Sequence, residues 1–250
     1  MKLLDKYYKY NFGPDVLIIS ERLNLNFDFV IEAGCHDGTD TEKLVKKLND
    51  VKVYAFEPDS KARLAARKKL SAYIPKQILI SSFALSDHNG KAFLVFEGVG
   101  MDGAKSGSGS SRVSKQGSQA IQLRTLDNVL PDKLRKGLLW LDVEGHAVQV
   151  LKGATKTLKK IVLAKIEIQM HDMGTGRKAD LFAVVNIMKQ ADLIPIYGPL
   201  NPGYFGDIIF VHRDLINRKN KIKSVLILLQ LYFLHSIVYP TLNKPKKLNS

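Results

Sequence analysis

The chain has 250 residues, of which 45% are hydrophobic, and this composition excludes a disordered or fibrous protein in favour of a globular one with a substantial core. Its 38 Lys and Arg residues outnumber its 24 Asp and Glu residues, and the formal charge of +14 favours anionic partners such as nucleic acid, acidic lipid or an anionic substrate. The single cysteine, Cys35, excludes an intrachain disulfide and suits a reducing compartment.

Strand-like and helix-like segments alternate along most of the chain. Strands are expected at residues 27–32, 51–57, 77–84, 138–143, 161–169, 194–197 and 207–212. Helices are expected at residues 40–48, 59–71, 147–152 and 180–191. Such alternation with short connections is typical of right-handed βαβ crossovers, so the sequence predicts one α/β domain around a mostly parallel sheet. We place this domain at residues 27–215, after an N-terminal extension at residues 1–26, and find no second domain.

A glycine-rich turn follows the first expected strand. Residues 29–38 read Phe-Val-Ile-Glu-Ala-Gly-Cys-His-Asp-Gly, an apolar run that ends in an acid and two glycines. Glycine lets a ligand approach the backbone closely, and the end of the first strand of an open parallel sheet is where nucleoside cofactors bind. This turn lacks both the Gly-x-Gly-x-x-Gly spacing and the P-loop signature, which argues against NAD, FAD and ATP.

Glu57 closes the second expected strand and is followed by Pro58. A carboxylate at this place can accept hydrogen bonds from two ribose hydroxyls, because an ionised carboxylate is an acceptor only. A solvated acid at the end of a strand is the alternative interpretation.

Further motifs close or follow the later strands. They are Ala84-Leu85-Ser86-Asp87 with Gly90, Thr125-Leu126-Asp127, Asp142-Val143-Glu144-Gly145-His146, and residues 151–154. Taken in order with residues 31–38 and 55–58, these motifs resemble the FkbM-type family of S-adenosylmethionine-dependent methyltransferases. The resemblance covers about residues 27–212, and the block at residues 142–146 is its most distinctive part.

This resemblance implies a Rossmann-like, seven-stranded methyltransferase sandwich and S-adenosylmethionine as the cofactor. It implies O-methylation of a small molecule, often a sugar or a secondary metabolite. The residues implied around the cofactor are Glu32, Gly34, His36 and Gly38 at its methionine end, Glu57 with Pro58 at the ribose, and Ala84 and Asp87 beside the adenine. Asp142 is implied to lie near the sulfonium and the acceptor.

The chain departs from the family pattern at four positions. The family usually has Asp where Glu32 stands and Asn where His36 stands, and it often has Lys at Trp140 and Glu at Ala147. A cofactor pocket tolerates such changes more easily than catalysis does, so the change at Ala147 bears most on the acceptor chemistry. Trp140 is most simply a core residue.

Transfer of a methyl group to a hydroxyl needs a group that removes the proton of the acceptor. His146 is the natural base by its intrinsic pKa, and Asp142 and Glu144 are alternatives or could orient it. If the strand continues through residue 144, the two acids share one face; if the turn starts at once, that relation is lost. Capping of the next helix by residues 144–146 is a further alternative.

A divalent metal is an alternative that we do not favour. Glu167, His171 and Asp172 follow the fifth strand, and with Asp142 they offer carboxylate and imidazole ligands. A polar cluster at the edge of the sheet is the simpler interpretation. Cys35 is interpreted as a small, partly buried residue near the cofactor.

Two segments differ from the rest of the chain. Residues 98–119 are rich in Gly and Ser and are expected to form a flexible insertion loop, either a plain surface loop or a mobile lid. Residues 216–250 are expected to form a basic and apolar C-terminal helix and tail. The apolar run at residues 225–239 is too short to span a bilayer and should pack as a helix, with contact at a membrane surface as the alternative. We find no secretory signal and expect a cytoplasmic protein, or one peripheral at the membrane.

The sequence as a whole predicts an S-adenosylmethionine-dependent O-methyltransferase that acts on a hydroxyl of a small acceptor, with a sugar, glycan or secondary metabolite favoured. A nucleic-acid methyltransferase is an alternative suggested by the charge, but the chain lacks the interleaved aromatic residues that stack on single strands. A non-catalytic membrane-surface module built on residues 225–239 is the other alternative. The acceptor and the oligomeric state are not predicted.

Overall fold

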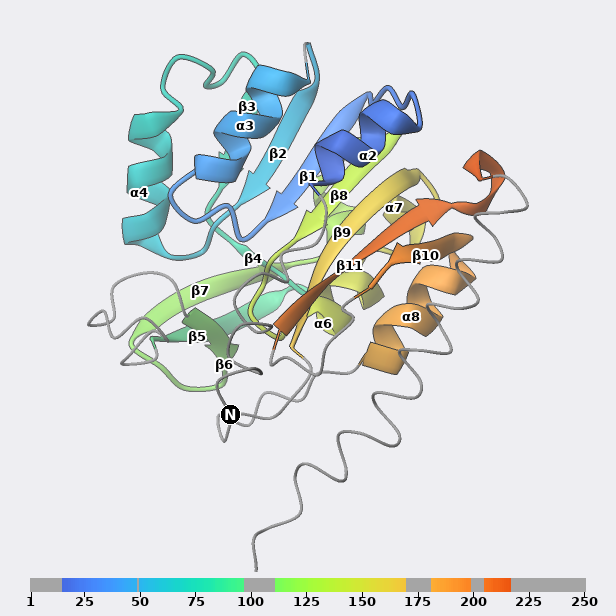
Figure 1. Cartoon of the computed structure of the whole chain (residues 1–250). Coiled ribbons are helices and arrows are strands. Elements are labelled where there is room, and N and C mark those ends of the chain that lie inside the picture. Colours follow the sequence, from blue (N-terminus) through green and yellow to red (C-terminus); the bar gives the residue numbers. More distant parts are fainter. Residues whose placement is uncertain (1–14, 49, 97–110, 170–180, 199–204, 217–250) are drawn as a thin grey trace, which may run out of the picture.

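The computed structural model describes residues 15–48, 50–96, 111–169, 181–198 and 205–216, which form two sheets flanked by helices (Figure 1). The larger sheet has seven strands in the order β10-β11-β9-β8-β1-β2-β3. Its strands are β1 (Phe29–Ala33), β2 (Lys52–Phe56), β3 (Ile78–Ser81), β8 (Gly137–Leu141), β9 (Ile161–Gln169), β10 (Leu193–Tyr197) and β11 (Phe205–His212). β11 runs antiparallel to both of its neighbours, whereas the other pairings are parallel. The predicted mostly parallel, seven-stranded sheet is confirmed.

Helices cover both faces of this sheet. One face carries α2 (Val16–Arg22), α3 (Thr39–Lys47) and α4 (Ser60–Lys69), and the other carries α5 (Leu126–Val129), α6 (Ala147–Lys152), α7 (Thr155–Leu158) and α8 (Leu181–Gln190). Alternate residues of β1 enter different cores, since Val30 packs with the first group of helices and Ile31 with the second. All of β1 is therefore buried, as expected for a central parallel strand.

A second, smaller sheet was not predicted. It has the order β4-β7-β5-β6 and consists of β4 (Ala84–Leu85), β5 (Gly90–Phe96), β6 (Ser111–Ser114) and β7 (Gln119–Arg124). The expected loop at residues 98–119 is wrong over residues 111–114, because β6 pairs antiparallel with β5 and places Val113 opposite Leu94. The expected strand at residues 77–84 is also too long, because β3 ends at Ser81 and Ala84 belongs to the smaller sheet.

Helix α2 lies within the expected N-terminal extension. The Asp15 carboxylate accepts the Leu17 N–H at 2.9 Å and so begins the helix. Val16 and Leu17 are buried in the core beside β1. This part of residues 1–26 therefore packs on the main sheet.

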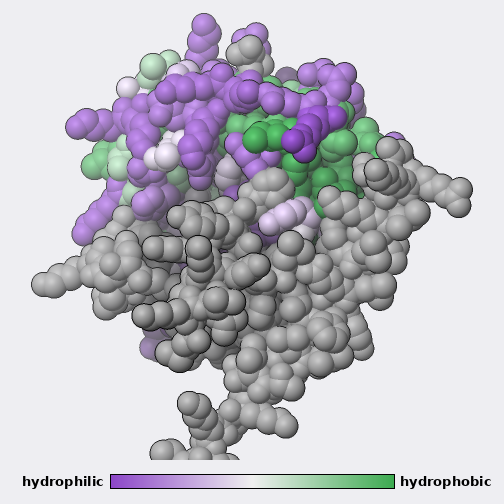
Figure 2. All heavy atoms as spheres, in the orientation of Figure 1, coloured by the Kyte–Doolittle hydropathy of each residue, from purple (hydrophilic) through white to green (hydrophobic). Residues whose placement is uncertain are grey.

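Hydrophilic residues cover most of the surface over α3 and α4, with hydrophobic residues between them (Figure 2), and Leu64 of α4 is exposed. Among the described residues, every helix is too short or too polar to cross a bilayer. The apolar run at residues 225–239, the segment at 97–110, and His171 and Asp172 lie outside the described residues.

Candidate active site

A cavity of about 350 Å³ opens where β1, β2 and β8 reach their carboxyl ends. Most of the site residues expected from the sequence line it: Glu32, Gly34, His36, Glu57, Pro58, Ala84, Asp142, Glu144 and His146. Gly38 and Asp87 are not among its lining residues. The cavity thus joins the glycine turn to the motif after β8, as expected from the parallel sheet.

The backbone of the glycine turn passes directly against the loop after β8. Gly34 has a φ of +84°, and a Cβ added there would lie 1.8 Å from the carbonyl oxygen of Asp142. The Asp142 N–H in turn donates to the Ala33 carbonyl at 2.9 Å. Only glycine fits this position. Gly38 has a different role, because with a φ of +81° it is the residue at which α3 begins.

Glu57 fixes the glycine turn through the backbone. Its Oε2 accepts the His36 N–H at 2.8 Å, and its Oε1 accepts the Asp59 N–H at 2.9 Å. Burial raises the pKa of this carboxyl, while the two N–H bonds and the neighbouring His36 oppose that rise. Each carboxylate oxygen keeps a lone pair beyond the one used here, so Glu57 can also accept a hydroxyl in the cavity.

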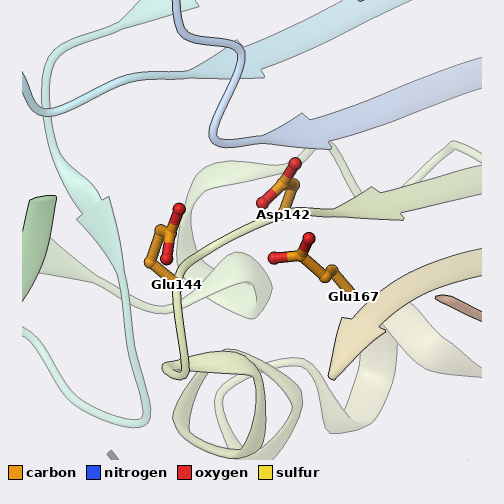
Figure 3. A group of neighbouring side chains, drawn as sticks. All are labelled: Asp142, Glu144 and Glu167. Atoms are coloured by element: carbon orange, nitrogen blue, oxygen red, sulfur yellow. The ribbon is translucent and has the colours of Figure 1, made fainter. Parts of the chain in front are cut away.

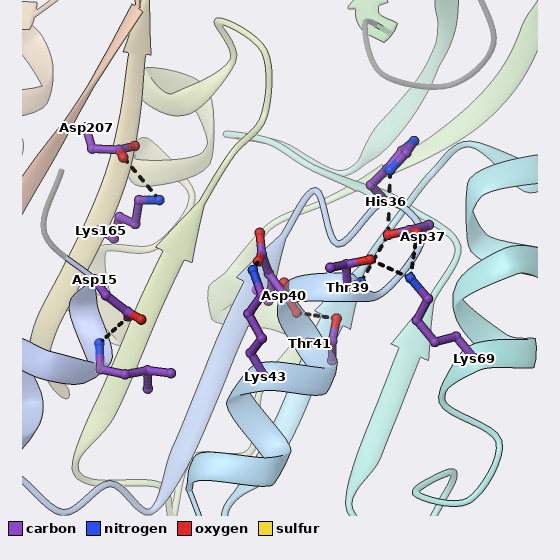
Figure 4. A network of polar contacts seen from close by, with 12 residues as sticks. Asp15, His36, Asp37, Thr39, Asp40, Thr41, Lys43, Lys69, Lys165 and Asp207 are labelled. Atoms are coloured by element: carbon purple, nitrogen blue, oxygen red, sulfur yellow. Dashed lines mark hydrogen bonds and ion pairs between the residues drawn. The ribbon is translucent and has the colours of Figure 1, made fainter. Parts of the chain in front are cut away.

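A polar network extends from the same turn to α3 and α4 (Figure 4). The Lys69 ammonium donates to Asp37 at 2.6 Å and also to Thr39. Burial would raise the pKa of Asp37, but the bonds from Lys69 and Thr39 outweigh it and hold the pKa at about 2. Asp37 therefore remains ionised and ties the turn to α4.

Glu32 lies at the floor of the cavity and is only 2% exposed. The Thr41 hydroxyl donates to its carboxylate at 2.6 Å. Burial nevertheless raises the pKa of Glu32 to about 8, and the charges of Asp40 and Asp142 add to that rise. Glu32 is therefore largely protonated at neutral pH.

Three carboxyl groups converge near the carboxyl ends of β8 and β9 (Figure 3), and two of them, those of Asp142 and Glu144, line the cavity. β8 ends at Leu141, so the turn starts at once and strand alternation does not apply to Asp142 and Glu144. The turn nevertheless brings carboxylate oxygens of Asp142, Glu144 and Glu167 within 4.8 Å of one another. Glu144 has a φ of +49°, and this left-handed backbone turns the chain at that point. The sequence had placed Glu167 only in an alternative metal site.

Asp142 and Glu167 share a hydrogen bond between their carboxyl groups. Burial raises the pKa of Glu167, and the charge of Asp142 raises it further, so Glu167 holds the proton of the pair. Asp142 lines the cavity, and burial raises its pKa as well, although the hydrogen bond with Glu167 and the charge of Lys165 oppose that rise. The three side chains are suitable ligands for a divalent cation, and the shared proton offers another way to reduce their repulsion.

His146 occupies the N-cap position of α6, but its side chain makes no capping bond. Its Nε2 lies 3.2 Å from the Ser86 hydroxyl instead. Burial lowers the pKa of His146, so the ring is neutral at pH 7. Ser86 is 1% exposed and was not predicted as a site residue, since nothing in the sequence shows that two residues 60 positions apart meet.

Trp140 lines the cavity rather than lying wholly in the core. The Lys165 ammonium lies 4.4 Å from the centre of its ring and 3.1 Å from the Asp207 carboxylate. Trp140 and Lys165 face each other in the register of β8 and β9. Lys165 on β9 therefore places a positive charge next to Trp140, the position at which the FkbM pattern often has lysine.

The smaller sheet closes the cavity with an apolar wall. Leu94 of β5 and Val113 of β6 line it together with Phe83, whose ring lies 5.5 Å from that of Phe56. The Gln119 amide of β7 donates to the Pro58 carbonyl at 2.7 Å and so joins the smaller sheet to the Glu57 side of the cavity. Sequence reasoning missed this wall, although β5 alternates buried and exposed residues.

The fold and the cavity define an α/β enzyme with a nucleoside-cofactor site at the carboxyl edge of its sheet. The methyltransferase FkbM domain matches residues 32–194, and the chain belongs to this family. The chain is 24% identical over 200 residues to the 2-O-methyltransferase NoeI of Sinorhizobium fredii (strain NBRC 101917 / NGR234), a match that covers 74% of this chain and 80% of NoeI. The predicted family, fold, class of enzyme and S-adenosylmethionine cofactor are confirmed.

Two solved methyltransferase structures are also similar. Magnesium protoporphyrin IX methyltransferase from Synechocystis PCC 6803 with bound SAH is 12% identical, with a TM-score of 0.47 and 79% of each chain covered. An rRNA methylase from Streptococcus thermophilus is 17% identical, with a TM-score of 0.46, covering 80% of this chain and 98% of that one.

The residues of the glycine turn fit S-adenosylmethionine. The Nε2 atom of His36 is buried and has no hydrogen-bond partner in the described ranges, so it offers a polar contact to a ligand. Gly34 leaves the backbone bare, and Glu57 keeps acceptor capacity for ribose hydroxyls.

Proposed function

We propose that this enzyme transfers a methyl group to a hydroxyl oxygen of a small acceptor, with a sugar, a glycan or a secondary metabolite as the acceptor class. The observation that carries the proposal is that the glycine turn and the Asp142–His146 segment line one cavity. The likeness to a 2-O-methyltransferase supports a hydroxyl as the accepting group.

When bound, S-adenosylmethionine supplies an electrophilic methyl group on a sulfonium. In this proposal Gly34 and His36 hold its methionine end, and Glu57 accepts hydrogen bonds from its ribose. Glu32 faces the same end as a carboxyl of raised pKa, and a cationic ligand would draw it toward its ionised form.

The remaining task of the protein is to hold the acceptor hydroxyl and to take its proton. Asp142 lines the cavity and can accept a hydrogen bond from that hydroxyl, which orients the oxygen. His146 is neutral at pH 7 and can take the proton. Leu94 and Val113 give the acceptor an apolar surface and exclude water.

The test begins with calorimetric titration of the purified protein with S-adenosylhomocysteine, with NAD and ATP as controls. Selective micromolar binding is expected. Transfer of radiolabel from S-adenosylmethionine is then measured over a panel of sugars, glycolipids, phenolic metabolites and RNA. Label on a hydroxyl of a small acceptor supports the proposal, whereas label on RNA or on nitrogen alone overturns it.

A further inference from the structure

We propose that Ser86 and Asp87 fix the proton of His146 on Nε2, so that Nδ1 is the nitrogen that accepts the proton of the acceptor hydroxyl. The inference rests on the proposed function for the role of His146 in transfer. It assigns Ser86 and Asp87 as positioning residues, although the sequence implied a place beside the adenine for Asp87.

The hydrogen-bond directions follow from the number of protons available. The Ser86 hydroxyl lies 3.2 Å from Asp87 Oδ1 and 3.2 Å from His146 Nε2, but it has one proton to donate. The His88 ring bonds to Asp87 at 2.6 Å and lowers the pKa of that carboxyl, which is therefore ionised and only accepts. Ser86 must then donate to Asp87, and His146 must donate from Nε2 to Ser86.

The position of Ser86 is fixed on several sides. Its side chain is buried, and its N–H donates to the Arg124 carbonyl at 2.8 Å. Its own carbonyl lies against Gly153 at the end of α6, where an added Cβ would come within 2.0 Å of the oxygen. The serine therefore holds a constant position relative to the helix that His146 begins.

The second ring nitrogen of His146 remains available. His146 lines the cavity, and within the described ranges Ser86 is the group that hydrogen-bonds to its ring. A neutral ring protonated on Nε2 carries its lone pair on Nδ1. Burial has the largest effect on the pKa of His146 and lowers it; the charge of Asp87 opposes that lowering, whereas the charge of His88 adds to it.

Every bond and proton of the transfer step is accounted for in this arrangement. As the acceptor oxygen bonds to the methyl carbon, the carbon–sulfur bond breaks and its electron pair goes to sulfur. The hydroxyl proton moves to Nδ1, and the resulting imidazolium keeps its Nε2 proton on Ser86. Release of the Nδ1 proton to solvent restores the starting state.

The tautomer is measured directly by long-range ¹H–¹⁵N NMR on ¹⁵N-histidine-labelled protein, with the His146 signals assigned through His146→Gln. We expect Nε2–H in the wild type and a mixture of tautomers in Ser86→Ala. Asp87→Asn is a second variant at a more exposed position, and its loss of charge should also populate Nδ1–H. Nδ1–H as the main wild-type form overturns the inference even if no acceptor has been found.

Kinetics then test the consequence. Ser86→Ala should lower kcat about 10-fold to 100-fold with the S-adenosylhomocysteine Kd unchanged, and His146→Gln should lower it by about 10²-fold to 10⁴-fold. The matched control is Ser20→Ala, which removes a buried serine hydroxyl that donates to the Leu17 carbonyl within α2. If Ser86→Ala keeps the wild-type kcat, the inference is wrong but the proposed function stands. If the wild type transfers no methyl group, the proposed function is wrong, and the NMR result still decides the tautomer.

Discussion

Acidic side chains at two places on the same edge of the sheet have different hydrogen-bond partners, backbone N–H groups at one place and another carboxyl group at the other. Both oxygens of Glu57, after β2, accept backbone N–H groups, so that carboxylate fixes the shape of the glycine turn. Asp142 and Glu167, after β8 and on β9, bond to each other and lie close to Glu144. A carboxylate satisfied by the backbone suits a rigid binding site, whereas carboxyl groups that face one another hold a proton that can move. On the proposed function, the Glu57 side is the binding region and the Asp142 side is the reacting region.

The largest effect should come from Gly34→Ala, where the two regions touch. The added Cβ has no space beside the Asp142 carbonyl, and the φ of +84° disfavours alanine, so we expect destabilisation of more than about 4 kcal/mol or failure to fold. Chemical denaturation measures it. Gly38→Ala is the matched control, because its nearest neighbour is the movable Leu70 side chain, and about 1–2 kcal/mol is expected there. Equal costs at the two positions would contradict the close approach.

Asp142→Asn should act on transfer rather than on cofactor binding. In our proposal this carboxylate orients the acceptor, so its loss should lower kcat by about 10²-fold or more. The Kd for S-adenosylhomocysteine should stay within about threefold. A loss of affinity with kcat unchanged would place Asp142 in the binding region.

Glu57→Gln should give the reverse pattern. The amide can no longer serve two N–H donors and ribose hydroxyls together, so the Kd for S-adenosylhomocysteine should rise about 10-fold to 100-fold. Calorimetry measures the change. The control is Glu42→Gln on α3, whose carboxylate pairs with Lys46 and does not line the cavity. Unaltered affinity in Glu57→Gln would leave Glu57 with a structural role only.

Glu32 should give the ligand-free protein a pH-dependent stability. Its folded pKa of about 8 lies above the ordinary 4.5, so the stabilising protonated form is complete below about pH 4.5 and is lost as the pH rises toward 8. At about 1.4 kcal/mol per pH unit, Glu32→Gln should remove about 2 kcal/mol of the decline between about pH 6 and pH 8. The remaining decline reports the other acids whose pKa is raised by burial, which are Glu167, Asp142 and Glu57. Denaturation curves at several pH values measure this, and identical slopes in wild type and variant would refute the burial argument.

The main sheet was predictable because its central strands are buried on both faces and so read as continuous apolar runs. The glycine turn and Glu57 were predictable because the carboxyl ends of parallel strands meet at one edge. The sequence carries a signal for α2, since Asp15 precedes an apolar run, although the pattern of strands and helices alone starts the domain at residue 27.

Other features depend on contacts that no local pattern encodes. β6 reads Ser-Arg-Val-Ser, which is too short and polar to be distinguished from the glycine and serine residues before it. The meeting of Asp142 with Glu167 depends on the pairing of β8 with β9, whose register shifts after Gly137. The contact of Ser86 with His146 requires the tertiary structure, because the two residues belong to separate motifs.

The position of Ser86 directly after β4 has a consequence for protein engineering. β4 belongs to the smaller sheet, and the same sheet supplies the apolar wall that would contact an acceptor. On our assignment, a chimera that takes this sheet from a relative to change acceptor choice also replaces the partner that sets the protonation of His146. Residues 84–87 and 146–153 therefore form one cassette, to be exchanged together or not at all.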